Sequence, residues 1–437
     1  MRGFLRILGP GLLYAGAAIG VSHLVQSTRA GAMFNYELIW VLVVANLLKY
    51  PFFEYGPRYA IATGSNNLLK YPFFEYGPRY AIATGSNLVD GYRRIGLWAV
   101  ILFALLTLVS MFVVQAAVTV VTVGLLANIL GWTIKITALS GIILAISLLI
   151  LLIGKYSALD KLIKFIIILL ALSTMVAVFA ALGIHKEIKP DSIGHFQWTR
   201  GADILFLISF IGWMPAPIDI SVWSSMWNLA KVKELGYKPE LNSALKEFRV
   251  GYIGTAILAL GFLMLGALIM YGSGETLSEK GVVFAEQLIT MYTTSIGKWS
   301  YWVISIAAFT TMFSTTITVL DAYARVLNPV VRHLIPGWWS GIKKKDNLQV
   351  FWLLLVILGA LVIIGFAATS MIKMITVATV LSFLVAPVMA WLNYRVVTDD
   401  HMPEGARPGL FLRLLSWTGI IFLVAFSLIY IYSAFNG

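Results

Sequence analysis

Cysteine is absent from this 437-residue chain, and charged residues make up only 12% of it. Without thiols the protein can form no disulfide and no thiolate metal site, and it cannot use thiol catalysis. With 59% hydrophobic residues and so few charges, the chain cannot cover a water-facing surface. These two absences exclude disulfide-stapled proteins, thiol enzymes and soluble multidomain proteins.

Motifs of nucleotide binding and of common hydrolytic enzymes are also missing. The sequence has no GxxxxGK loop, no HExxH zinc motif and no GxSxG nucleophile motif. The net charge of +12 would suit a nucleic-acid partner in a soluble protein, but here Lys and Arg lie between apolar runs. We therefore expect no enzyme, no cofactor, no nucleotide and no nucleic acid. An intramembrane enzyme that uses His23 as base and Asp219 as its orienting group stays open as an alternative.

Apolar runs near bilayer length recur along the whole chain, each long enough for a membrane-spanning helix of about 20 residues. They predict an all-α polytopic membrane protein that is embedded in a lipid bilayer. The eleven predicted spans cover residues 8–32, 35–56, 96–129, 134–153, 162–183, 202–228, 250–272, 296–325, 349–367, 371–393 and 411–433.

Basic residues predict the orientation of these spans. Lys and Arg are concentrated in alternate loops, for example at residues 93–94 and 343–345, and the intervening loops hold fewer of them. Short loops rich in Lys and Arg stay in the cytoplasm, so the pattern places the N-terminus inside. The start MRGFLRILGPGLL resembles a signal peptide but lacks an A-x-A cleavage site, and we expect a retained first helix. The expected location is the plasma membrane, or the inner membrane of a bacterium.

A stretch of 21 residues occurs twice in tandem. Residues 46–66 (NLLKYPFFEYGPRYAIATGSN) recur without a change at 67–87. The unit carries a Lys, a Glu, an Arg and two Pro, and each charge costs roughly 2.5 to 3.5 kcal/mol at a bilayer centre. We expect the first copy to finish the second span and the second copy to lie on the cytoplasmic side as a helix end or loop. A duplication without function stays open.

Two spans are interrupted at membrane depth. In span 1, polar residues and Gly20 interrupt the apolar run, and in span 6 the string WMPAPID places Pro215 and Pro217 two residues apart. Prolines so spaced remove backbone donors and clash with the preceding turn, so the helix must stop and restart. Breaks in the first and sixth helices are typical of a 5+5 inverted repeat with a substrate site at the breaks. We expect one transmembrane domain over residues 1–437, with repeats at 8–183 and 202–393 and an extra helix at 411–433.

Polar side chains inside the spans are few, and each allows two interpretations. An Asp at membrane depth needs a partner: Asp321 could pair with Arg325 one turn later, whereas Asp219 lies beside the proline break. His23 could be an interhelical hydrogen-bonding residue, a ligand or a proton carrier. Met214 could be a packing residue or a thioether ligand for a soft metal.

At these residues the chain resembles the Nramp family of divalent-metal transporters. The resemblance rests on GPGLLYAGAAIG with LIWVLVVANLL, on IATGSNLVDGYRR, on the Met-Pro of span 6 and on STTIT of span 8. It implies the LeuT-type fold with eleven helices, and a metal ion held between the breaks of helices 1 and 6.

The chain also departs from the family pattern. Where the family carries Asp-Pro-Gly-Asn in helix 1, residues 20–23 read Gly-Val-Ser-His, and where it carries Met-Pro-His-Asn in helix 6, residues 214–217 read Met-Pro-Ala-Pro. Gln115 and Val118 stand at the positions of the family's proton-handling acids. The resemblance therefore implies altered metal ligands and weak or absent proton coupling.

A dication that leaves water needs compensating oxygen or nitrogen ligands, so Asp219 and Asp321 are the expected sources of negative charge. The candidate residues fall into three groups. The substrate or metal ligands are Ser22, His23, Gln26, Met214, Asp219 and Asp321; the supporting polar residues are Gln115, Thr315 and Thr318; and the hinge residues are Gly20, Pro215 and Pro217.

The sequence therefore predicts a secondary transporter that moves a divalent metal ion by alternating access. Two alternatives stay open. One is a transporter of a small organic solute on the same fold, in which a half-helix N-terminus would hold a carboxylate. The other is a non-transporting metal sensor.

Overall fold

The computed structural model describes residues 10–63, 86–132, 134–153, 156–184, 188–235, 240–341, 345–367 and 370–436, and all regular elements in these ranges are helices. The first half contains α2 (Pro10–Ala18), the π-helix η1 (Ser22–Ser27), α3 (Thr28–Phe34), α4 (Ile39–Thr63), α6 (Leu88–Ile95), α7 (Leu97–Leu130), α8 (Ile136–Ile153) and α9 (Tyr156–Ala181). The second half contains the 3-10 turn η3 (Pro190–Ser192), α10 (Gly201–Gly212), α11 (Ile220–Leu235), α12 (Leu241–Ile269), α13 (Gly281–Ile296), α14 (Ser300–Leu334), α15 (Pro336–Gly341), α16 (Lys345–Ala367), α17 (Met371–Thr398), the 3-10 turn η4 (Glu404–Ala406) and α18 (Leu410–Asn436).

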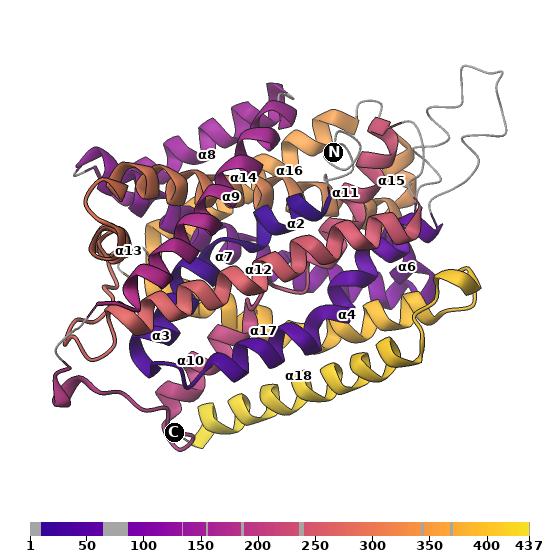
Figure 1. Ribbon diagram of the computed structural model, residues 1–437. Helices are drawn as coiled ribbons and strands as arrows, with labels where there is room; N and C mark the ends of the chain where they lie inside the picture. Colours follow the sequence, from indigo (N-terminus) through magenta and orange to yellow (C-terminus); the bar gives the residue numbers. More distant parts are fainter. Residues whose placement is uncertain are drawn as a thin grey trace.

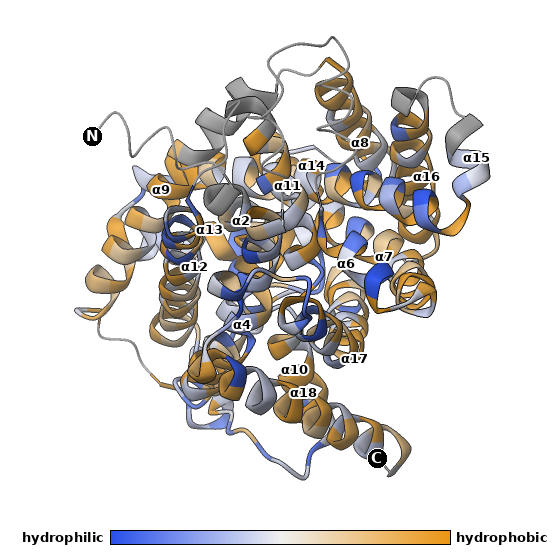
Figure 2. Cartoon of the chain, turned by 90° about the vertical axis from the view of Figure 1, so that its right-hand side faces the viewer, coloured by the Kyte–Doolittle hydropathy of each residue, from blue (hydrophilic) through white to orange (hydrophobic). Residues whose placement is uncertain are grey.

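The helices form one bundle with α18 at one edge and α8 at the opposite edge (Figure 1). Outer helices expose large apolar side chains, such as Phe179, Phe366 and Ile421, and they are hydrophobic on the outside in Figure 2. Exposure of so many large apolar side chains is unfavourable in water, whereas contact with lipid tails is not. Among the described residues, the helices α7, α8, α12, α14, α16, α17 and α18 are each long and apolar enough to cross a membrane.

Each predicted span coincides with one helix or with a broken pair of helices. Four predicted spans, numbers 1, 2, 5 and 6, have no counterpart among these seven helices, so the number of eleven crossings stays a prediction. Spans 1 and 6 are divided into shorter helices, and α4 of span 2 carries Lys49, Glu54 and Arg58. The structure adds α6, α13 and α15, which the hydropathy pattern did not reveal. Of these, α6 begins with a capping box, in which Asn87 accepts from the backbone of Asp90 and the Asp90 carboxylate accepts from the Asn87 N–H.

The predicted break in span 6 is confirmed. The helix α10 ends at Gly212 and α11 begins at Ile220, with a cis peptide bond between Met214 and Pro215. Span 1 is also divided, since α2 ends at Ala18 and the chain resumes as the π-helix η1, a geometry that is frequent at functional sites. Both breaks lie deep within the bundle, where backbone groups need partners from the protein.

Two glycines fix the backbone around the second break by close helix packing. A Cβ atom at Gly56 of α4 would lie 2.1 Å from the carbonyl oxygen of Ser221 in α11. A Cβ atom at Gly212 would lie 2.2 Å from the carbonyl oxygen of Thr379 in α17. Side chains larger than hydrogen therefore do not fit, and α4, α10, α11 and α17 are held at backbone contact.

The tandem duplication is only partly described. Residues 46–63 of the first copy belong to α4, as the sequence predicted for the end of the second span. Residues 64–85, which include most of the second copy, lie outside the described residues, and so does the predicted position of that copy.

Candidate functional site

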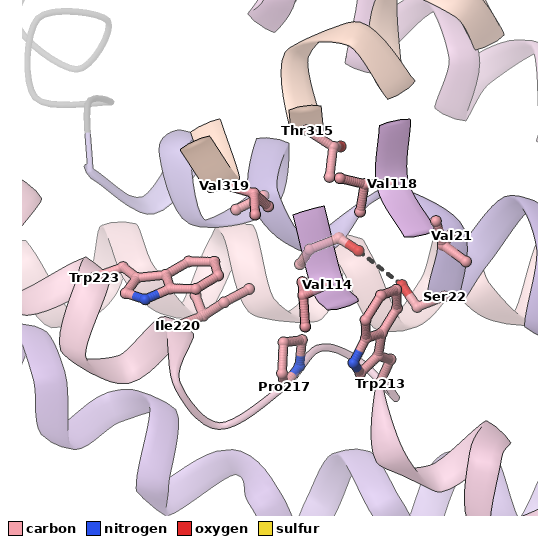
Figure 3. Close-up of a pocket in the computed structure, with 12 residues that line it drawn as sticks. Val21, Ser22, Val114, Val118, Trp213, Pro217, Ile220, Trp223, Thr315 and Val319 are labelled. Atoms are coloured by element: carbon pink, nitrogen blue, oxygen red, sulfur yellow. Dashed lines mark hydrogen bonds between the residues drawn. The ribbon is translucent and has the colours of Figure 1, made fainter. Parts of the chain in front are cut away.

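A small cavity lies between the two breaks. Its volume is about 20 Å³, which is room for about one water molecule. Figure 3 shows Ser22, Thr315 and Pro217 around it, together with apolar side chains from α7 and α14. The cavity is lined by Ala17, Ala18, Val21, Ser22, Val114, Val118, Trp213, Pro217, Ile220, Trp223, Thr315 and Val319. Ser22 and Thr315 supply the hydroxyl groups of this lining.

At the break in helix 1, one hydroxyl group from another helix lies within hydrogen-bond distance of the backbone carbonyl oxygens. Thr315 Oγ1 of α14 lies 3.1 Å from the carbonyl oxygen of Gly16 and 3.2 Å from that of Ile19. It also lies 3.1 Å from the carbonyl oxygen of Thr311 in its own helix. A threonine hydroxyl carries one hydrogen, so it can donate to only one of these three oxygens at a time. A Cβ atom at Gly20 would lie 3.0 Å from Thr315, so glycine gives this hydroxyl its access to the break.

The π-helix after this break is tied to neighbouring helices. His23 is fully buried, with Nε2 2.9 Å from the carbonyl oxygen of Thr255 in α12 and Nδ1 2.7 Å from Ser22 Oγ. The carbonyl can only accept, so Nε2 carries a hydrogen. Ser22 Oγ also lies 2.8 Å from the carbonyl oxygen of Ala18, and its single hydrogen can go to only one of these two acceptors at a time. Gln26 donates to Ser209 of α10 at 2.5 Å. His23 and Gln26 therefore hold the π-helix against α12 and α10.

At the break in helix 6, an ammonium group donates hydrogen bonds to the backbone carbonyl oxygens. Lys49 of α4 is completely buried, and its Nζ donates to the carbonyl oxygens of Ile211 at 3.1 Å, Gly212 at 3.1 Å and Ala216 at 2.9 Å. The first two oxygens end α10, where a helix leaves its last carbonyls without partners. An ammonium has three N–H bonds, so each has its own acceptor. The Phe53 ring lies 5.8 Å from Nζ and adds a cation–π contact.

The carboxylate of Asp219 carries the opposite charge to Lys49. It lies partly buried just before α11, and its charge and that of Lys49 attract each other. Its neighbours Pro217 and Ile220 line the cavity. Met214, the predicted thioether ligand, is fully buried at the end of α10 but is not among the lining residues.

The remaining predicted residues have partners elsewhere. Asp321 accepts from Arg325 at 2.6 Å, which is the helical pairing that the spacing allowed. Gln115 donates to the carbonyl oxygen of Thr316 at 3.3 Å, and its buried Oε1 has no hydrogen-bond partner among the described residues. Thr318 is buried in α14.

Ion pairs hold one end of the bundle together. Glu54 of α4 pairs with Arg58 in its own helix and with Arg249 of α12, and it accepts from Tyr50. Arg58 also donates to the carbonyl oxygen of Ala406 at 2.9 Å. These contacts tie α4 to α12 and to the segment before α18.

Asp90 of α6 forms a second ion-pair cluster at this end. It pairs with Arg332 and His333 at the end of α14. Burial alone would raise the pKa of Asp90, but the hydrogen bond from His333 and the charge of Arg332 outweigh it and hold this pKa below its ordinary value.

The structure therefore brings Ser22, Thr315 and Pro217 together at the cavity, with Gly20 packed behind Thr315, and leaves the other predicted ligands outside its lining. Within the described ranges, no group of three or more His, Cys, Asp or Glu side chains could hold a metal ion. The sequence missed Lys49 as a site residue. Its signal was a Lys in the middle of a predicted span, one residue before Tyr50-Pro51.

Family membership follows from the sequence as a whole. A model of the natural resistance-associated macrophage protein-like family, Nramp, matches residues 75–433. The chain belongs to the Nramp family. An uncharacterized protein of Pasteurella multocida (strain Pm70) is 36% identical over 430 residues, which cover 97% of this chain and 91% of that protein.

Solved structures of other proteins share the fold of this Nramp family member. A mutant of the manganese transporter of Eremococcus coleocola is 12% identical with a TM-score of 0.65, covering 100% of this chain and 88% of that one. The nucleobase-cation-symport-1 family transporter Mhp1 is 13% identical with a TM-score of 0.58, covering 98% and 92%. MhsT in complex with L-phenylalanine is 15% identical with a TM-score of 0.56, covering 98% of both chains. The predicted LeuT-type fold is thereby confirmed, and the protein is an integral membrane protein of a transporter family.

Proposed function

We propose that this protein is a secondary transporter that moves a divalent metal ion across the membrane by alternating access around the helix-1 break. The observation that carries the proposal is the excess of acceptors over donors at this break. The carbonyl oxygens of Gly16 and Ile19 share the single hydrogen of Thr315, and Ser22 adds another hydroxyl beside the same cavity. A cation that approaches Thr315 would bind these carbonyl oxygens in place of the hydrogen bond that they share.

The chemistry of these groups favours a hard cation. Carbonyl and hydroxyl oxygens are ligands of Mg²⁺ and Mn²⁺, whereas thioethers select softer metals. Met214 does not line the cavity, so the proposed substrate is a cation of the magnesium or manganese class. That the fold neighbour from Eremococcus coleocola is a manganese transporter fits this class.

Asp219 is the proposed source of negative charge. A dication among neutral oxygens alone would bear a large desolvation cost. Asp219 follows directly after the cavity-lining segment, and it interacts electrostatically with the ammonium of Lys49. We propose that opening of the cavity turns this carboxylate toward the metal ion, and that His23 and Gln26 position the π-helix rather than bind the ion.

The cavity has to open during transport. Its volume of about 20 Å³ cannot admit a hydrated ion, and it is far below the roughly 300–1,000 Å³ of pockets for organic ligands. A small ion therefore fits this site better than an organic solute does. We propose that the ion pairs of Glu54 and Asp90 separate when the site opens toward their end of the bundle.

Proton coupling is proposed to be weak or absent. Gln115 and Val118 cannot carry a proton, and Val118 lines the cavity directly. We also propose that the N-terminus is cytoplasmic, that the protein lies in the plasma membrane, and that residues 8–183 and 202–393 form two inverted repeats.

Uptake by proteoliposomes tests the function. Protein reconstituted with a fluorescent metal indicator and a pH probe inside should take up Mn²⁺ or Mg²⁺ at least about tenfold faster than empty liposomes, with no change of internal pH. Fe²⁺ in the same panel tests the preference for hard cations. The D219N variant should lose at least about 90% of the rate.

The matched control is D321N, which removes the same charge from a residue paired with Arg325 in its own helix. It should keep at least half of the rate. Metal binding without uptake would support the sensor instead, and uptake of an organic solute that metals do not inhibit would support the organic-solute transporter. Equal rates for D219N and the parent protein would contradict the role of Asp219.

A further inference from the structure

Lys49 is not a proposed ligand of the transported ion, yet it is among the most completely buried charged groups of the described chain. Its side chain reaches from α4 into the break of helix 6 and ends among three backbone oxygens, those of Ile211, Gly212 and Ala216. We call these three oxygens the carbonyl cage. The C-terminal end of α10 adds its partial negative charge to the cage.

The carbonyl cage suits a singly charged cation. Its oxygens lie 2.9–3.1 Å from Nζ, beyond the roughly 2.0–2.6 Å at which oxygen ligands hold Mg²⁺ or Ca²⁺. They are neutral, and the carboxylate of Asp219, which interacts with Lys49 electrostatically, carries one negative charge against the one positive charge of the ammonium. Rings of backbone carbonyls replace the hydration shell of potassium ions in channels, and an ammonium group is similar in size to potassium.

Two backbone contacts beside the cage hold the segments on either side of the helix-6 break. Gly212, which supplies one of the oxygens, is pressed against Thr379 of α17. Gly56, two helical turns beyond Lys49 in α4, is pressed against Ser221 of α11. These backbone contacts hold both sides of the break at fixed positions, so the oxygens should stay together when the lysine side chain is shortened.

We propose that the carbonyl cage is a site for a monovalent cation which Lys49 occupies permanently as a tethered ammonium. The side chain takes the place of a free potassium or sodium ion, so the protein needs no such ion to hold the helix-6 break. Removal of the lysine should therefore create a binding site for a free monovalent cation.

The test is the thermal midpoint of detergent-solubilised protein in KCl, NaCl and N-methyl-D-glucamine chloride at equal ionic strength. The parent protein should have one midpoint in all three salts. The midpoint of K49A should be higher in KCl than in N-methyl-D-glucamine chloride by at least about 3 °C, since a ligand that binds only the folded state stabilises it. Addition of ethylammonium chloride should also raise it.

Two matched variants separate a cation site from a general salt effect. K49M fills the space of the lysine stem without a charge and leaves no room for an ion, so its midpoint should be the same in every salt. K298A removes an exposed lysine and should behave like the parent protein.

Several results would overturn the proposal. These are a K49A midpoint that is equal in all three salts, a K49M midpoint that depends on potassium as much as that of K49A, or a parent midpoint that depends on the alkali cation. If K49A does not fold in N-methyl-D-glucamine chloride, recovery of folded protein in ethylammonium or potassium chloride supports the proposal, and failure in every salt overturns it. The readout requires no transport, so it is independent of the identity of the transported ion.

Discussion

Both helix breaks leave backbone carbonyl oxygens without donors from their own helix, and different side chains supply the missing donors at each break. At the helix-1 break, one threonine hydroxyl is shared among carbonyl oxygens, whereas at the helix-6 break three N–H bonds of Lys49 meet three carbonyl oxygens. The first break has more acceptors than donors, and the second is saturated. The difference indicates which break can accept a cation from outside and which already contains one.

The same difference separates their energetic roles. Removal of a buried, paired charge costs more than removal of a neutral hydroxyl, because the partner charge is left without compensation. The helix-6 break should therefore be a structural joint, and the helix-1 break the place where binding takes place.

The largest effect is expected from the loss of the Lys49 charge. K49M should lower the free energy of unfolding by about 3–5 kcal/mol, since three carbonyl oxygens lose their donor and the buried Asp219 loses the opposite charge with which it interacts. The double variant K49M/D219N should recover at least about 1 kcal/mol relative to the sum of the single variants, measured by reversible unfolding in detergent. Strict additivity would show that Lys49 and Asp219 do not interact.

A smaller effect is expected at the other break. T315V removes the shared hydroxyl and keeps the shape of the side chain. It should lower the free energy of unfolding by about 1–3 kcal/mol, because the carbonyl oxygens of Gly16 and Ile19 lose a donor. T315S keeps the hydroxyl and should retain most of the stability and of the metal uptake. If T315V lowered the free energy of unfolding more than K49M does, the helix-1 break would contribute more to stability than the helix-6 break, contrary to the account.

Asp90 provides a reference outside the bilayer. Its pKa is lowered in the folded protein by His333 and Arg332, and Tyr59 also faces it. A lowered folded pKa contributes stability that is present above the ordinary pKa of about 4 and is lost as the pH falls through the folded value. The midpoint difference between parent and D90N should therefore shrink below about pH 4. A difference that grows with acid would show that the pKa is raised instead.

The smallest effect is expected from deletion of one copy of the repeat. Removal of residues 67–87 leaves Lys49 and its neighbours in α4 unchanged, since the two copies are identical. The midpoint and the uptake rate should match those of the full chain. An inactive deletion variant would assign a function to the second copy.

The sequence predicted the breaks because Pro215 and Pro217 act locally, by removing donors and blocking the preceding turn. It also predicted a helix for every span, because hydropathy alone selects helices in lipid. It did not reveal what fills the breaks. Lys49 contacts residues 162–167 positions away, and a lysine in a span with prolines and a glutamate indicated a poor span rather than a buried ligand.

The ligand prediction was weaker for the same reason. Asp321 and Arg325 are four residues apart, so their pairing was one of two interpretations available from spacing. His23 contacts Thr255, which is 232 residues away, and no local pattern separates such a contact from a metal ligand. Thr315 was expected only as a supporting residue, because a hydroxyl in a helix usually bonds to its own preceding turn.

The most direct test of the account is the position of a bound metal ion. Crystals grown with Mn²⁺ should show its anomalous scattering beside Thr315 and Ser22 at the helix-1 break, with the Lys49 ammonium still within hydrogen-bond distance of Ile211, Gly212 and Ala216. A manganese peak inside the carbonyl cage, with Lys49 displaced, would contradict it.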